Sequence, residues 1–150
     1  MSMFSRLRGA SPVTPSDAIA RAVITPMVST MVADGSIDDS EIAQLGNVCS
    51  FSPIFFQIDQ KGLIKMVRSI LDEIRASGHD ATIRAAAGKL SLALRETSFC
   101  FAARIAFADG RIDQGERNSL AQTAIHMQIA PEVCERIIEV VAMMQRPPSA

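Results

Sequence analysis

The chain has 150 residues, of which 48% are hydrophobic and 21% are charged, and this balance excludes an intrinsically disordered protein. Fifteen basic and sixteen acidic residues give a formal net charge of −1, so no overall positive field is available to hold a nucleic-acid backbone. The three cysteines, Cys49, Cys100 and Cys134, form no CxxC pair, and we expect them to be buried, reduced thiols in a cytoplasmic protein.

The N-terminal segment, residues 1–14, is expected to be flexible. It contains Arg6 and Arg8 but no following apolar stretch, so it does not have the pattern of a signal peptide. The most apolar stretch, residues 18–33, is too short and too interrupted to cross a bilayer, which needs about 20 apolar residues. We therefore expect a soluble protein without direct membrane insertion.

The first predicted helix occupies this apolar stretch. Ile19, Val23, Met27 and Met31 fall four residues apart, and other apolar residues lie beside them, which indicates a helix buried on a wide face. Pro26 is expected to kink this helix or to restart it, with Thr25 capping the second piece.

Further helices are predicted along the rest of the chain. A short amphipathic helix should carry Ile42 and Leu45, and a strong one should run from about Gln60 to Ala76 between an Asp59 cap and Ser77-Gly78. Residues 80–94 continue in helical pattern with a break near Ser91. A last helix should open at Pro131 and stop before Pro147.

The expected fold class is therefore all-α, with about seven helices and no convincing strand pattern. We expect one helical domain over residues 15–146, followed by a short tail at 147–150. The methionines at 27, 31, 66, 143 and 144 are expected to fill irregular space in its core.

Two segments of the chain repeat. Residues 33–45 read ADGSIDDSEIAQL and residues 108–120 read ADGRIDQGERNSL, with seven of the thirteen aligned positions identical. The offset between them is 75 residues, half the chain, which indicates two pseudo-symmetric halves rather than a solenoid of many units.

Each repeated segment has the local chemistry of a turn between two helices. In the first, Gly35 can close one helix and Asp38 can cap the next, with Glu41 completing a capping box. Ile37 and Ile42 can form a hydrophobic staple. The second segment repeats the scheme with Gly110, Asp113, Glu116 and Ile112, although Arg117 stands where the apolar staple partner would be.

Capping explains Asp38, Glu41, Asp113 and Glu116, but it does not explain Asp34 and Asp109. An aspartate at the C-terminal end of a helix faces the negative end of the helix dipole. Its presence in both segments suggests cation binding, and carboxylates without neighbouring His or Cys favour Ca, Mg or Mn. The acids of both turns could converge, or one turn could act with backbone carbonyls and water. The spacing is not that of an EF-hand.

The doubled A-D-G-x-I-D-x-x-E motif resembles the tellurite-resistance TerB family. The opening Met1-Ser2-Met3-Phe4, the Arg-Leu-Arg-Gly-Ala run at 6–10 and the Ala-Pro-Glu at 130–132 are also similar to that family. The resemblance implies an all-helical bundle in two pseudo-symmetric halves, an acidic cluster that binds metal ions, and a role in resistance to tellurite and related stresses. It also implies a membrane-embedded partner, which would hold this cytoplasmic protein at the inner membrane.

Carried over by position, the metal ligands that the resemblance implies are Asp34, Asp38, Glu41, Asp109, Asp113 and Glu116. Gln114 and Gly115 stand where family members often have further acids, so weaker binding is expected in the second half.

No catalytic apparatus is recognisable in the sequence. His79 and His126 are separated and have no clear partner, and the chain has neither a G-x-S-x-G motif nor a phosphate-binding G-x-x-x-x-G-K-[ST] loop. We expect a non-enzymatic protein. The alternative to a cation-binding protein is a helical interaction module that docks a membrane-associated partner without metal; the ion, the partner and the oligomeric state stay open.

Overall fold

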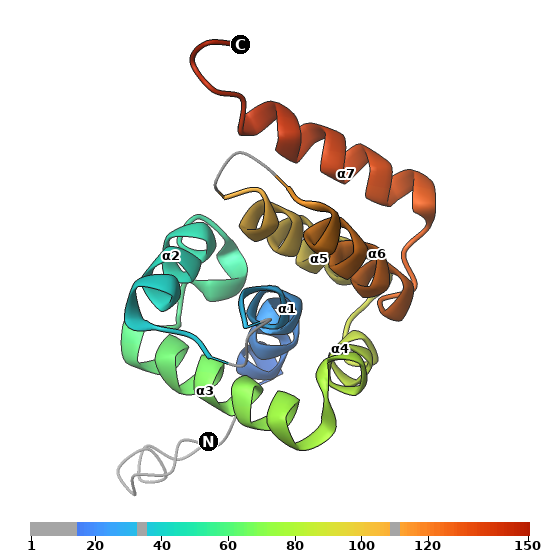
Figure 1. Cartoon of the computed structure of the whole chain (residues 1–150). Helices are drawn as coiled ribbons and strands as arrows, with labels where there is room; N and C mark the ends of the chain where they lie inside the picture. Colours follow the sequence, from blue (N-terminus) through green and yellow to red (C-terminus); the bar gives the residue numbers. More distant parts are fainter. Residues whose placement is uncertain (1–14, 33–35, 109–111) are drawn as a thin grey trace, which may run out of the picture.

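The computed structural model describes residues 15–32, 36–108 and 112–150 (Figure 1). The described residues form seven α-helices, a short 3-10 helix and no strand, which confirms the predicted all-α fold. The helices are α1 (Pro15–Met31), α2 (Asp39–Cys49), α3 (Gln60–Ser77), α4 (His79–Ala87), α5 (Leu92–Ala106), α6 (Gln114–His126) and α7 (Pro131–Met144), and the 3-10 helix η2 (Pro53–Phe55) lies between α2 and α3.

Helix α1 is the centre of the molecule. Every residue from 22 to 29 is buried, and the helix packs against α3, α4, α5 and α6 (Figure 1). The wide apolar stripe in its sequence predicted this burial. One partly exposed position, Arg21, forms a 2.8 Å ion pair with Glu73 of α3 and so ties the two helices together at the surface.

The predicted restart of the helix at Pro26 is wrong. Helix α1 runs through Pro26 without interruption, and Thr25 does not cap a second helix. Instead, the hydroxyls of Thr25 and Thr30 donate to the carbonyl oxygens of Arg21 and Pro26, each at 2.8 Å. Burial on all sides keeps the segment helical, because breaking it would expose the apolar face on which the rest of the fold packs.

The other helix ends follow local chemistry closely. Asp59 accepts the Gly62 N–H at the start of α3, and Gly78 ends that helix with φ of 86°, as predicted. Ser91 caps α5, which confirms the break near this residue, but α4 already ends at Ala87. It stops early because the chain turns through Gly88 and Lys89 and places Leu90 in the core.

The two halves of the chain pack in a reciprocal way. Helices α1, α2 and α3 are followed by α5, α6 and α7 in the same order, and α1 packs on α5. Helix α2 contacts α5, whereas α6 contacts α1, so each half places its second helix on the first helix of the other. This exchange is what an approximate two-fold axis between α1 and α5 produces. Helix α4 joins the halves and has no counterpart in the described part of the second half.

No helix in the described part of the chain combines the length and the apolar character that crossing a membrane requires.

Candidate functional site

The first acidic turn leads into α2 through Asp38. The Oδ1 atom of Asp38 accepts the backbone N–H of Glu41 at 2.8 Å and the hydroxyl of Ser40 at 2.8 Å. Glu41 completes the capping box, since its Oε1 atom lies 3.5 Å from the backbone nitrogen of Asp38. The predicted cap is therefore confirmed, and these residues have the geometry that starts a helix.

The same hydrogen bonds set the charge of Asp38. The backbone N–H of Glu41, followed by the Ser40 hydroxyl, lowers the pKa of the Asp38 carboxyl below its ordinary value of 3.8. Donors that stabilise the ionised carboxylate favour loss of its proton. Asp38 is exposed, so a negatively charged oxygen pair stands at the surface beside the start of α2.

The second acidic turn shares the aspartate N-cap of the first, at the start of α6, whereas among the described residues the reciprocal glutamate bond of a capping box is recorded for Glu41 alone. Asp113 is the N-cap, and its Oδ1 atom accepts the backbone N–H of Glu116 at 2.7 Å. Asp113 is exposed and Glu116 is partly buried, as are their counterparts Asp38 and Glu41. Both described turn ends thus present one exposed capping aspartate and one half-buried glutamate in equivalent positions.

The remaining sequence-predicted ligands, Asp34 and Asp109, lie outside the described residues, as do Gly35 and Gly110. In the part of the chain that the structure describes, no three Asp, Glu, His or Cys side chains gather into a group that could hold a metal ion. The four described acids therefore do not form one shared cluster by themselves.

The donor chemistry of the turns nevertheless fits a hard cation. Each turn offers carboxylate oxygens, the ligands that Ca, Mg and Mn prefer. In both turns the capping hydrogen bond is accepted by the Oδ1 atom of the aspartate, Asp38 or Asp113. A complete site would draw its further oxygens from Asp34 or Asp109, from backbone carbonyls or from water.

Positive charge lies close to the first turn. A hollow of about 420 Å³ beside the start of α2 is lined by Asp39 and Ile37 on one side and by Arg68 and Arg75 of α3 on the other. Arg75 also lies 3.8 Å from Asp72 within α3. In α7, no arginine stands at a position that corresponds to Arg68 or Arg75 of α3. The electrostatic surroundings of the two turns therefore differ.

The two histidines meet partners that the sequence did not reveal. His79, at the start of α4, shares a 2.7 Å hydrogen bond between its Nδ1 atom and the Ser29 hydroxyl of α1. His126 places its Nε2 atom 3.2 Å from the Oδ1 atom of Asp80, but the two groups are not aligned as a hydrogen bond. Both contacts join different helices at the junction of α1, α4 and α6, so each histidine is part of the packing there.

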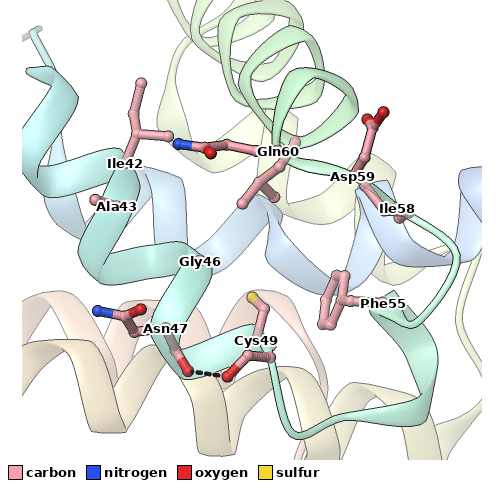
Figure 2. A pocket seen from close by; sticks show the side chains of 11 residues that line it. Ile42, Ala43, Gly46, Asn47, Cys49, Phe55, Ile58, Asp59 and Gln60 are labelled. Carbon is pink, nitrogen blue, oxygen red and sulfur yellow. Dashed lines mark hydrogen bonds between the residues drawn. The ribbon is translucent and has the colours of Figure 1, made fainter.

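A mostly apolar pocket of about 320 Å³ lies between α2, η2 and the start of α3 (Figure 2). Gly46 permits this close approach of α2 to α3, because a Cβ atom at Gly46 would lie 3.3 Å from Leu63. Asp59 lies on the rim and caps α3 through a 2.7 Å bond. The Ser50 hydroxyl donates a 2.8 Å hydrogen bond to the carbonyl oxygen of Asn47 where α2 ends, and Figure 2 marks this bond by a dashed line. Two of the polar residues around this pocket, Asp59 and Ser50, therefore make hydrogen bonds at helix ends.

The cysteines correct one expectation. Cys49 and Cys134 are buried, and burial raises the pKa of the Cys49 thiol to about 12. Cys100 is exposed, contrary to the prediction that all three would be buried. The methionine prediction also fails at the C-terminal end of α7, where Met143 is 42% and Met144 is 60% exposed.

The family model described as tellurite resistance protein TerB matches residues 20–139, from the second turn of α1 to the middle of α7. A search of curated proteins and a search of solved structures each found no match.

Proposed function

The chain belongs to the TerB family, and we propose that it is a non-enzymatic stress-response protein that binds a hard divalent cation through its two acidic turns. The observation that carries the proposal is the duplication of the turn. The same acids stand at the same positions 75 residues apart, and in both turns the capping aspartate accepts the backbone N–H of the glutamate three residues later.

The proposed ligands are Asp34, Asp38 and Glu41 in the first half and Asp109, Asp113 and Glu116 in the second. Capping accounts for Asp38 and Asp113, whereas a cation accounts for the acid that precedes each turn glycine in the sequence. Calcium, magnesium or manganese is the proposed ion, because every proposed side-chain ligand is a carboxylate.

Family membership supports a role in tellurite resistance, which the description of the matching family names, and we extend the proposal to related stresses. We place the protein in the cytoplasm, beside a membrane-embedded partner of the same resistance system. A cation bound at one or both turns would then adjust the charge of the surface that the partner meets, since each bound divalent ion offsets two carboxylate charges.

Isothermal titration calorimetry on chelator-treated protein tests this proposal. We expect Ca, Mg or Mn to bind, and the stoichiometry reports whether the turns converge on one site or act as two. Replacing both Asp34 and Asp109 by Asn should abolish binding, whereas Glu139→Gln, on the exposed surface of α7, should leave it unchanged. Absence of binding for every ion, or equal loss in the control variant, would contradict the proposal.

A further inference from the structure

An apolar groove lies between α5 and α7, the outermost helix in Figure 1. Its volume is about 570 Å³, and its floor is formed by Cys100 and Phe101 of α5 and by Val133, Ile137, Val140 and Met144 of α7. Val140 is 51% and Met144 is 60% exposed, although both are large apolar side chains. Helix α7 packs mainly against α5. No other described helix covers the side of α7 that faces the groove.

The first half of the molecule contains the equivalent groove with a helix seated in it. There α1 and α3 correspond to α5 and α7, and α4 packs against both of them (Figure 1). Helix α4 buries a face of small and branched residues, Thr82, Ile83, Ala86 and Ala87. Among the described residues no helix equivalent to α4 follows α7, and none is seated in the groove of the second half.

Helix α7 keeps the apolar pattern of a covered helix. The buried residues of α3 are Leu63, Val67, Ile70, Leu71 and Ile74. A shift of 70 residues aligns them with Val133, Ile137, Val140, Val141 and Met144, and all five of these line the groove. In α3 every one of these positions is buried, whereas in α7 only Val141 is. The sequence of α7 therefore suits a helix that is more fully covered than the described residues cover it.

Helix α5 shows the same difference. Ala22, Thr25 and Ser29 of α1 are all buried. Their counterparts 75 residues later, Thr97, Cys100 and Arg104, all line the groove, and none of them is buried.

The charges around the groove specify the chemistry of an occupant. In the first half, Ser29 of α1 bonds His79 in the first turn of α4. The residue of α5 that corresponds to Ser29 is Arg104. A helix seated like α4 would therefore bring its first turn to Arg104. Arg136 also lines the groove, so two arginines stand against the single acid Glu96. An acidic first turn meets this charge and is also favoured by the dipole of the incoming helix.

We propose that the α5–α7 groove binds an amphipathic helix of a partner protein, seated as α4 is seated between α1 and α3. The bound helix has small and branched apolar residues on one face and an acidic residue in its first turn. This mode of recognition places an apolar helix face in an apolar groove and is independent of the cation proposed above.

The α4 sequence itself is the probe, because it is a helix that already fits the equivalent groove and carries Asp80 in its first turn. A peptide of residues 77–91 would be cross-linked between positions 81 and 85, which are exposed in α4, so that it is helical in solution. Cys100 is an exposed thiol on the groove floor, whereas Cys49 and Cys134 are buried, so alkylation followed by intact mass measures groove occupancy.

We expect the peptide to protect Cys100 from alkylation in the full-length protein. Val140→Glu should weaken this protection by about tenfold or more, because the groove would have to desolvate a charge. Ala142→Glu adds the same charge to an exposed position of α7 outside the groove and should leave protection unchanged. Arg104→Gln should lower the affinity and reduce its dependence on salt.

Three outcomes would overturn the proposal. The first is no protection of Cys100 at any peptide concentration, and the second is equal loss in Val140→Glu and Ala142→Glu. The third is protection without peptide that rises with protein concentration and disappears in Val140→Glu, since the groove would then be an interface between two copies of this chain.

Discussion

The Ser98 hydroxyl of α5 donates a 2.6 Å hydrogen bond to the backbone carbonyl oxygen of Val23 in α1. The two residues are 75 positions apart, the same offset that separates the acidic turns, and both are completely buried. Equivalent residues of two related halves can touch only near the axis that relates them. This contact therefore places the approximate two-fold axis between α1 and α5 at the centre of the core.

Removing the Ser98 hydroxyl should weaken the contact between the two halves of the molecule. We expect Ser98→Ala to lower the free energy of unfolding by about 1 kcal/mol, the usual net value of a buried hydrogen bond. Thr97→Ala is the control, because the Thr97 hydroxyl bonds the carbonyl oxygen of Ala93 within its own helix. Urea unfolding of both variants makes the comparison, and an equal effect at the two positions would argue against a special role for the Ser98 bond.

The backbone conformation at position 78 requires glycine. With φ of 86° it ends α3 and starts α4, and a Cβ atom there would have open space but a strained conformation. Gly78→Ala should therefore destabilise the fold by about 1 kcal/mol. Gly88→Ala is the matched control, since Gly88 has φ of −63° and its added Cβ would make ordinary contacts. If thermal melts show the same change for both variants, the backbone argument at Gly78 is wrong.

The cap of α2 should respond to acid. Because hydrogen bonds from Glu41 and Ser40 lower the pKa of Asp38 below 3.8, the folded state favours its ionised form. The resulting stability is fully present above the ordinary pKa and is lost as the pH falls through the lowered value. Asn also caps helices but does not titrate, so Asp38→Asn should flatten the decline in unfolding free energy below about pH 4.

The control for this acid response is Glu139→Gln on α7, which removes a different exposed acid. Urea midpoints measured from pH 7 down to pH 3 should show the flattened profile in Asp38→Asn alone. A profile for Asp38→Asn that parallels the wild type at every pH would show that the cap does not contribute to acid sensitivity.

The features predicted well from sequence depend on residues close together in the chain. The capping box of Asp38 and Glu41 spans four positions, and the Asp59 cap and the turn at Gly78 are equally local. These features can therefore be predicted from neighbouring residues without knowing the fold. The repeat at an offset of 75 also predicted that two halves would share one arrangement.

The failures depend on packing between distant segments. Pro26 stays inside α1 because four other helices surround it, and no local signal measures that enclosure. Similarly, Ser29 meets His79 across 50 positions, and His126 meets Asp80 across the junction of α4 and α6. Met144 was predicted to be a core residue but lies on a groove that no described helix fills.

The proposed cation should stabilise the folded protein. An ion that binds only the folded state raises its stability by mass action, so the melting temperature becomes dependent on ion concentration. Without metal, Asp34→Asn and Asp109→Asn should be as stable as the wild type or more stable, because each removes a negative charge from an acidic turn. Asp38→Ala is the control, since loss of a cap should destabilise the fold with or without metal.

The most direct test of the central claim is the melting temperature of the chelator-treated wild type and of Asp34→Asn and Asp109→Asn, each with excess chelator and with millimolar Ca, Mg or Mn. We predict that at least one ion raises the melting temperature of the wild type and that both Asn variants lose much of this increase. A wild-type melting temperature that is the same with chelator and with every ion would contradict cation binding at the acidic turns.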